Sequence, residues 1–152
     1  MNDFAFLLLS EPDAPRKANS SDCVIRHGSH IDFGYIHKTW LRVWRSHFPR
    51  DVNDALFSEY HRHIFNRILA NSKVYIATIE EDESMVLGYL VARKDVLHWV
   101  WVRSAFRRMG IANALMDAYL REAGKPRYAS HWTQSGEHFV KKLGLKFNPF
   151  LI

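Results

Sequence analysis

A buried-strand pattern that runs directly into a basic, glycine-containing turn constrains this chain more than any other feature. Residues 95–102 are almost continuously apolar, which is typical of a strand covered on both faces of its sheet. The turn occupies residues 107–110, and apolar residues then recur at helical spacing from 111 to 118. A further strand is predicted over 127–132, so this part of the sequence predicts a right-handed, parallel strand-helix-strand crossover.

The rest of the sequence also divides into helices and strands. Ser29 and Asp32 have the spacing of a capping box at a helix start, and Gly144 is suited to end the last helix. The acidic run at 80–83 separates two strand-like runs and indicates the solvated tip of a hairpin. The other predicted elements are a strand at 23–26, helices that begin near 30 and 54, strands at 73–79 and 85–92, a helix at 135–143 and a strand at 145–152.

These elements predict an α/β fold of the α+β type. The sheet is expected to be mixed but mostly antiparallel, with six to seven strands flanked by four helices. With 152 residues and 47% hydrophobic composition, the chain has enough apolar surface for one core, which we assign to a domain over 23–152. Residues 1–22 contain a Ser-, Pro-, Asp- and Asn-rich stretch and are predicted to form an N-terminal arm.

Charge and composition restrict the function classes. A formal charge of +5 favours an anionic partner, but no helix-turn-helix, zinc-finger or RNP-like pattern is visible, so nucleic acid is an unfavoured partner. The apolar run at 4–9 is too short to cross a bilayer, and no membrane association is predicted. Cys23 is the single cysteine and cannot form an internal disulfide, which favours a cytoplasmic location. No Cys/His spacing suggests a metal site.

The turn after residue 102 is suited to bind a diphosphate. Backbone N–H groups at the start of a helix have no intrahelical partner and lie at the positive end of the helix dipole. Gly110 has no Cβ, so phosphate oxygens can approach the backbone there, and neighbouring arginines add formal charge. The predicted contacts to such a cofactor are Arg107, Arg108, Met109, Gly110, Ile111 and Ala112.

The same residues resemble a known signature. Arg107-x-x-Gly110-x-Ala112, after a strand that ends at Val102, resembles the Arg/Gln-x-x-Gly-x-Gly/Ala motif of the GNAT family of N-acetyltransferases. The Lys-Leu-Gly-Leu sequence at 142–145 is similar to the family's Lys-Leu-Gly-Phe ending. The predicted order of elements also matches, so the likeness covers most of the chain. A dinucleotide-binding fold is disfavoured because no GxGxxG pattern is present.

The resemblance implies a donor, an acceptor and a binding geometry. The donor is acetyl-CoA, and the acceptor is a primary amine of a small molecule, a protein lysine or a protein N-terminus, which attacks directly in a ternary complex. The pantetheine arm is expected to bond main-chain groups near Val100 and Val102, between central parallel strands that splay apart around Trp99 and Ala129. Thr133 could hydrogen-bond the same arm. The apolar tip of the N-terminal arm could pack on a second subunit, which leaves a homodimer open.

Two features of the strand at 95–102 suggest how it assists the chemistry. His98 interrupts the apolar run, and some GNAT members place a histidine or glutamate base on this strand, so His98 is the candidate base that deprotonates the amine. A structural histidine hydrogen-bonded in the core fits the same pattern equally well. A backbone N–H near Val100, on a distorted strand, could stabilise the negative charge that develops on the thioester oxygen.

The family's usual acid for the departing thiolate is missing. Val140 stands where many GNAT members have a tyrosine. Tyr128, Ser135 or His138 could substitute as the acid, or water could protonate the thiolate. The same departure supports an alternative function, in which the chain is a catalytically lapsed interaction protein on the GNAT fold that binds a protein partner.

Overall fold

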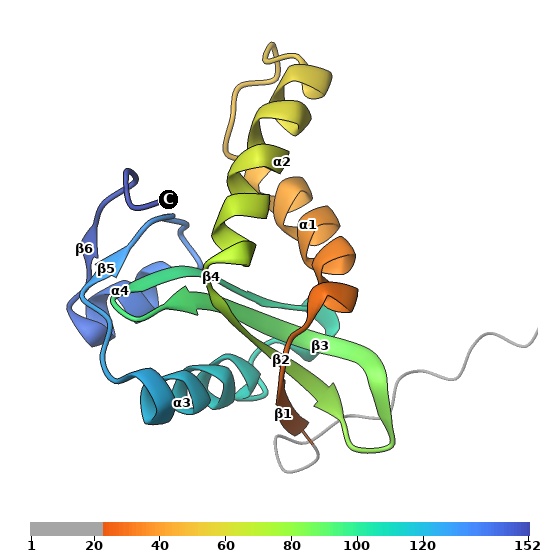
Figure 1. Cartoon of the computed structure of the whole chain (residues 1–152), viewed down its shortest axis with the longest axis vertical. Coiled ribbons are helices and arrows are strands. Elements are labelled where there is room, and N and C mark those ends of the chain that lie inside the picture. Colours follow the sequence, from red (N-terminus) through yellow and green to blue (C-terminus); the bar gives the residue numbers. More distant parts are fainter. Residues whose placement is uncertain (1–22) are drawn as a thin grey trace, which may run out of the picture.

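The computed structural model describes residues 23–152 as a six-stranded sheet with helices on both faces (Figure 1). The predicted arm, residues 1–22, lies outside the described residues. The strands lie side by side in chain order, from β1 at one edge to β6 at the other. The elements are β1 (Cys23–His27), α1 (His30–Arg45), α2 (Asp54–Ala70), β2 (Lys73–Ile79), β3 (Asp82–Arg93), β4 (Val96–Val102), α3 (Ile111–Ala123), β5 (Tyr128–Ala129), α4 (Glu137–Leu143) and β6 (Lys146–Phe147).

Strand directions confirm the predicted mixed sheet. β1 to β4 form three successive antiparallel pairs, whereas β5 pairs in parallel with both β4 and β6. The strand-helix-strand unit from β4 through α3 to β5 is therefore a parallel crossover, as the sequence predicts. β4 lies in the middle of the sheet, where its apolar run is covered on both faces.

The last two strands are much shorter than predicted. β5 has two residues where 127–132 was expected, and β6 has two where 145–152 was expected. The physical reason is that the chain turns away from β4 after Ala129, so the following residues have no strand to pair with. Trp132 and Thr133 therefore suit strand formation locally but lack a partner.

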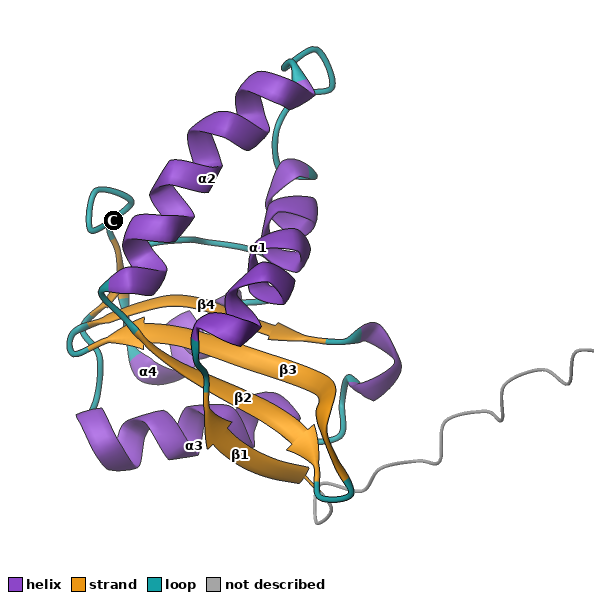
Figure 2. Ribbon diagram, turned by 45° about the vertical axis from the view of Figure 1, so that its right-hand side comes forward, coloured by secondary structure: helices purple, strands orange, loops and turns teal. Residues whose placement is uncertain are grey.

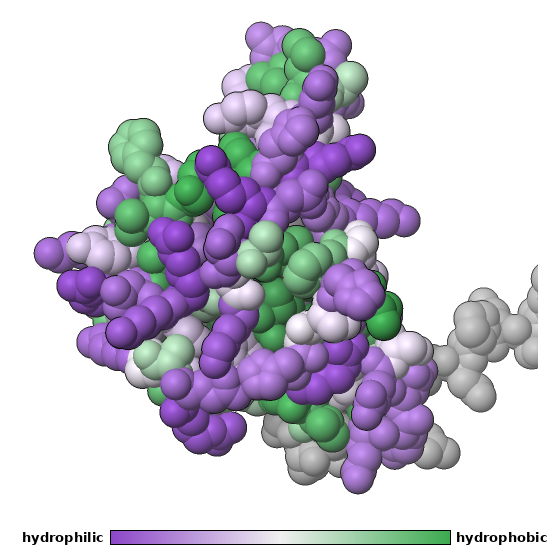
Figure 3. Space-filling model, in the orientation of Figure 1, coloured by the Kyte–Doolittle hydropathy of each residue, from purple (hydrophilic) through white to green (hydrophobic). Residues whose placement is uncertain are grey.

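Helices α1 and α2 lie on one side of the sheet, and α3 and α4 lie on the other (Figure 2). Each side has its own hydrophobic core. On one face α1 and α2 pack aromatic side chains, among them Trp40 and Phe65, against the sheet. On the other face α3 and α4 contribute Leu115, Tyr119 and Phe139. Hydrophilic side chains cover most of the surface seen in Figure 3, with apolar ones visible between them.

The predicted capping box begins α1 and ties it to β1. The Ser29 N–H donates to Asp32 Oδ2 at 2.8 Å, and the Arg26 guanidinium donates to both Asp32 carboxylate oxygens at 2.8 and 2.9 Å. The hydrogen bonds from Arg26 lower the pKa of Asp32. One buried carboxylate therefore holds the helix start and the edge strand together.

β3 and β4 lie too close together at Gly88 to leave room for a side chain. A Cβ at this position would lie 2.6 Å from the backbone oxygen of Trp101. The Trp101 ring stacks on the ring of Tyr89, the next residue of β3, with the centroids 5.3 Å apart. Glycine is thus required where these strands set the position of the β4 end, which leads into the turn.

Candidate functional site

The turn after β4 is held by buried side chains at both of its ends. Phe106, the last residue of a short 3-10 helix (Ser104–Phe106), is 4% exposed, and Ile111 at the start of α3 is 2% exposed. Between them, φ is positive at Arg108 (65°) and at Gly110 (82°). A left-handed conformation costs a residue with a Cβ about 1–2 kcal/mol, whereas glycine adopts it readily. The turn is therefore fixed in place and favours glycine at position 110.

The backbone N–H groups of residues 110–113 point to an anion site. No protein acceptor within 23–152 takes these N–H groups, and the first such bond of α3 runs from Ala114 N to Gly110 O at 3.0 Å. These donors lie at the positive end of the helix dipole. Arg107 Nε donates to the Val102 carbonyl at 3.2 Å, which holds this guanidinium beside the turn. The arrangement fits a diphosphate.

A groove of about 390 Å³ extends from this turn. It follows β4 from Val102 back to Trp99 and reaches Val43 on α1, so it joins the turn to the helical layer on the other face. Its walls contain arginine and histidine but no Asp or Glu. The lining residues are Val43, Trp99, Val100, Trp101, Val102, Phe106, Arg107, Arg108, Gly110, Ile111, Ala112, Asn113, Thr133, Ser135, Gly136, His138 and Phe139.

The groove opens where β4 and β5 separate. The two strands pair at Val96 with Tyr128 and at Leu97 with Ala129, and the Ser130 N–H then donates to the Leu97 carbonyl at 3.2 Å. Beyond this point β4 continues without β5 beside it, and the groove takes β5's place. We call the region where the strands part the fork. Its position agrees with the splayed central strands expected from the sequence.

A β-bulge distorts β4 at the fork. Val91 of β3 faces Trp99 and Ala92 faces Leu97, so His98 is an extra residue on β4. The predicted distortion near Val100 thus falls two residues earlier. Bulges redirect side chains and leave backbone groups outside the regular ladder, and here this happens beside the groove.

Most of the predicted cofactor contacts meet at the groove. Thr133 and Ser135 also line it, opposite β4. Met109 packs instead on the α3 side of the core. Tyr128 lies at the paired end of β5, where the Arg127 guanidinium carbon is 5.6 Å from its ring centroid, and it does not line the groove. The predicted contacts that line the groove are Val100, Val102, Arg107, Arg108, Gly110, Ile111, Ala112 and Thr133.

His98 lies in the core rather than on the groove wall. It is 2% exposed, and its Nδ1 lies 2.7 Å from Ser130 Oγ. Burial, assisted by the charge of Arg93, lowers the pKa of His98 to about 4. The imidazole is therefore neutral at pH 7.

The structure adds two residues that sequence reasoning missed, Ser130 and His131. Ser130 Oγ also lies 2.9 Å from His131 Nδ1. Burial, together with the neighbouring His98 and His61, lowers the pKa of His131 to about 3. No local signal identifies these residues, because they lie in a segment that reads as an ordinary strand and their partners come from β4 and α2.

The position of the missing tyrosine lies beside the groove lining. Val140 is half-buried and packs against the core between the sheet and α3. Ser135, just before α4, and His138, in the first turn of α4, both line the groove. These two side chains are therefore polar groups of the segment before Val140 that reach the groove.

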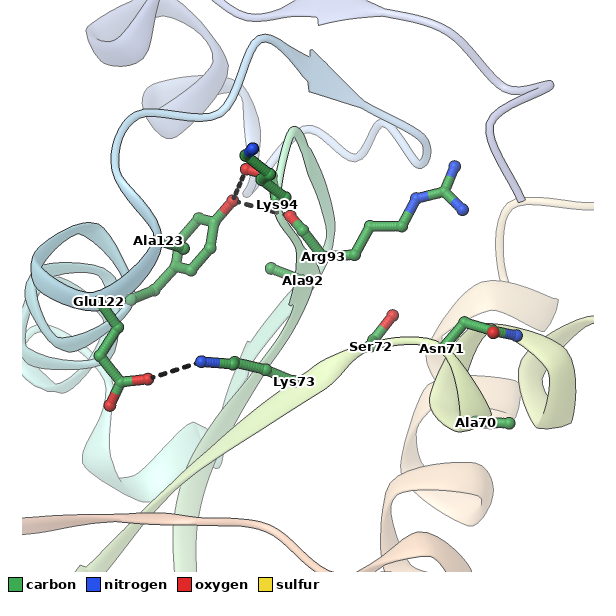
Figure 4. A pocket seen from close by; sticks show the side chains of 10 residues that line it. Ala70, Asn71, Ser72, Lys73, Ala92, Arg93, Lys94, Glu122 and Ala123 are labelled. Carbon is green, nitrogen blue, oxygen red and sulfur yellow. Dashed lines mark hydrogen bonds and ion pairs between the residues drawn. The ribbon is translucent and has the colours of Figure 1, made fainter.

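A second cavity, of about 530 Å³, lies away from the groove (Figure 4). Lys73 Nζ and Glu122 Oε2 form an ion pair at 3.3 Å on its wall, and the Tyr119 hydroxyl donates to the Arg93 carbonyl at 3.0 Å. These polar groups largely satisfy one another. Their contacts stabilise the packing of α3 on β2 and β3.

Neither a membrane span nor a metal cluster is present in the part of the chain that the structure describes. No helix between residues 23 and 152 has the length and apolarity needed to cross a membrane. Within the same range, no group of three or more His, Cys, Asp or Glu side chains is arranged to hold a metal ion.

Comparisons with solved structures identify the same arrangement of elements. A protein from Pyrococcus furiosus described as an acetyl transferase has a TM-score of 0.66 at 18% identity, with 86% of this chain and 97% of that chain covered. A ribosomal-protein-alanine N-acetyltransferase from Brucella melitensis gives 0.56 at 13% identity, covering 86% and 98%. An acetyltransferase from Clostridium acetobutylicum, solved with acetyl-CoA, gives 0.55 at 13% identity, covering 86% and 94%. No curated protein matches the sequence.

The fold combines a mixed sheet with a groove that runs from the strand-helix turn along β4. The sequence model of the acetyltransferase (GNAT) family matches residues 36–144. The chain belongs to this family. It is an acyl-CoA-dependent acyltransferase whose donor is acetyl-CoA. The turn fits that donor, because the N–H groups of residues 110–113 have no protein acceptor within 23–152.

Proposed function

We propose that the protein transfers an acetyl group from acetyl-CoA to a primary amine by direct attack in a ternary complex. The observation that carries this proposal is the groove itself. It joins the free N–H groups of residues 110–113 to the unpaired edge of β4 and ends beside α1. A donor and an acceptor can therefore approach the fork from opposite ends.

The turn is proposed to bind the diphosphate of the donor. Arg108 and the N–H groups of residues 110–113 supply charge and hydrogen bonds, and Arg107 lies beside them. Main-chain groups of Val100 and Val102, with the Thr133 hydroxyl, are proposed to hold the pantetheine arm along the groove. Bound acetyl-CoA supplies the activated thioester.

The fork is proposed to be the place of acyl transfer. A backbone N–H near Val100, just beyond the bulge, is proposed to stabilise negative charge on the thioester oxygen. His98 and the groups bonded to it are the proposed route for the amine proton. Ser135 and His138 line the groove and are the proposed sources of a proton for the thiolate, in place of tyrosine at Val140.

The acceptor end of the groove has a chemical preference. Its lining contains Val43 and Trp99 but no carboxylate, so nothing on this wall forms an ion pair with additional ammonium groups of the acceptor. We therefore propose an acceptor with one reactive amine and apolar neighbouring groups. A polyamine is the poorer fit, since its further charges would lose hydration without a paired carboxylate.

The test combines donor binding with turnover. Calorimetry with acetyl-CoA should give a saturable isotherm, and release of the free thiol should depend on both donor and amine across a panel of small amines and peptides. Donor binding without turnover of any amine would favour the catalytically lapsed interaction protein. No donor binding at millimolar concentration would refute both the diphosphate site and the activity.

A further inference from the structure

Three polar side chains at the fork form one hydrogen-bonded chain. Ser130 Oγ lies 2.7 Å from His98 Nδ1 and 2.9 Å from His131 Nδ1. Ser130 is 3% exposed and His98 is 2% exposed, so two of the three members are enclosed by protein. These hydrogen bonds cross from β4 to the residues that follow β5, directly beside the last pairing contact between the two strands.

The single proton of the serine hydroxyl gives this chain a direction. Ser130 Oγ–H can donate to only one imidazole, so the other imidazole donates its own N–H to Ser130. In one arrangement His131 Nδ1–H donates to Ser130, and Ser130 donates to His98 Nδ1. Nε2 of His131 is then an acceptor, and Nε2 of His98 carries a proton. The opposite arrangement, with both tautomers exchanged, satisfies the same two distances, and the relay uses the first one.

The two ends of the chain lie in different surroundings. The partly exposed His131 ring packs edge to face against Trp44 at 4.8 Å and Trp99 at 6.0 Å, and Trp99 lines the groove. His98 instead lines a separate cavity of about 240 Å³, together with Arg67 of α2 and Arg93 of β3. The hydrogen-bonded chain therefore runs from a ring packed behind Trp99 of the groove wall to a second cavity lined by His98, while His131 itself is not among the groove-lining residues.

Neither histidine is suited to hold a proton on its own. Burial lowers the pKa of both imidazoles. The charged or titratable groups that face them are Arg93 and Arg67 toward His98, and His98 and His61 toward His131. Burial and the positive charge of Arg93 oppose protonation of His98, and burial is the main cause that opposes protonation of His131. A chain that passes a proton onward avoids this difficulty, since no imidazolium has to accumulate in the enclosed site.

We propose that His131, Ser130 and His98 form a proton relay that carries the acceptor amine's proton from the groove to the cavity beside His98. The inference rests on the proposed acetyl transfer. His131 is the catalytic residue that contacts the amine, and Ser130 and His98 are positioning residues that act through it. The relay gives the buried Ser130 hydroxyl a role, whereas a mechanism with one histidine as the base would not need this hydroxyl.

Each proton that leaves one atom of the relay arrives at the next. The amine's N–H bond breaks as its nitrogen bonds to the acyl carbon, and that proton bonds to His131 Nε2. The Nδ1 proton of His131 moves to Ser130 Oγ, the Ser130 hydroxyl proton moves to His98 Nδ1, and His98 releases its Nε2 proton to solvent in the cavity. The C–S bond breaks with its electron pair on sulfur, and the thiolate takes a proton from the groove.

Removal of the bridging hydroxyl tests the relay. Ser130→Ala should lower kcat by about 100-fold, the lower end of the usual range for general acid-base catalysis, while the Kd for acetyl-CoA stays unchanged. Ser130→Thr keeps a hydroxyl and should recover most of kcat. Thr78→Val is the matched control, because Thr78 is fully buried on β2 and its hydroxyl has no partner within 23–152. It should keep the wild-type kcat.

A proton inventory separates the relay from a structural role, and its wild-type measurement needs no variant to fold. In mixtures of H₂O and D₂O, kcat of the wild type should follow a curved dependence on deuterium fraction, since several protons move together. In Ser130→Ala the dependence should become linear. Wild-type turnover with a linear inventory, or Ser130→Ala with unchanged kcat, overturns the relay but leaves acetyl transfer intact. Absence of turnover with every amine refutes the proposed function and the relay together.

Discussion

Replacing Gly110 with alanine should weaken donor binding much more than it weakens the fold. Gly110 has φ of 82°, so an alanine there loses about 1–2 kcal/mol of folding stability. Its methyl group also stands where the diphosphate must approach the free N–H groups of residues 110–113. Loss of one charge-assisted hydrogen bond at about 1.5–3 kcal/mol raises Kd for acetyl-CoA by roughly 10- to 150-fold.

The matched control for this prediction is Gly144→Ala. Gly144 has φ of 63° and ends α4, and nothing lies within 4 Å of a Cβ added to it. This variant should lose about the same stability in thermal unfolding but keep the wild-type Kd in calorimetry. Equal Kd values for the two variants would refute the reasoning, because backbone strain alone would then account for the effect of Gly110→Ala.

Three further predictions concern stability and turnover. Asp32→Asn should lower the free energy of unfolding by about 2–3 kcal/mol in urea titrations, because the buried ion pair with Arg26 is lost. Asp54→Asn is the control, because the carboxylate of its ion pair is 84% exposed, and it should change this free energy by less than about 1 kcal/mol. Because folding lowers the pKa of Asp32, its contribution to the free energy of unfolding should be full above about pH 4 and disappear as the pH falls through the lowered pKa. If the wild type and Asp32→Asn differ in free energy of unfolding by the same amount down to about pH 2, this reasoning is wrong. Gly88→Ala should lower Tm, because the added Cβ clashes with β4. Gly34→Ala is the control, since a Cβ added there in α1 meets nothing within 4 Å, and it should raise stability by about 0.5–1 kcal/mol. A higher Tm for Gly88→Ala than for Gly34→Ala would count against the close approach of β3 and β4. Val140→Tyr should raise kcat about 10-fold if protonation of the thiolate limits turnover, and an unchanged kcat with intact Tm would show that this step is not limiting.

The sequence was sufficient for the parts of the fold that local pattern determines. The apolar run of β4, the glycine turn and the stripe of α3 lie within about 30 consecutive residues, so their order and the parallel crossover follow from spacing and chain geometry. The capping box at Ser29 and Asp32 is equally local. The same locality made the free N–H groups of the turn predictable, because they belong to one helix start.

The features that the sequence did not reveal depend on contacts between distant segments. β5 ends at Ala129 because the chain leaves β4 there, and nothing in the strand-like composition of 130–132 indicates this. Ser130 bonds to His98, 32 residues earlier, and His131 packs among aromatic side chains of α1 and α2. Such partners are set by tertiary packing, so neither the fork's position nor the hydrogen-bonded chain could be predicted from local pattern.

A crystal structure of the protein with bound CoA is the most direct test of the central claim, that the turn between β4 and α3 binds the diphosphate of the donor. The account predicts diphosphate oxygens within hydrogen-bond distance of the N–H groups of residues 110–113, with the pantetheine arm along β4 toward the fork. A diphosphate bound elsewhere, with these N–H groups left to water, would contradict it.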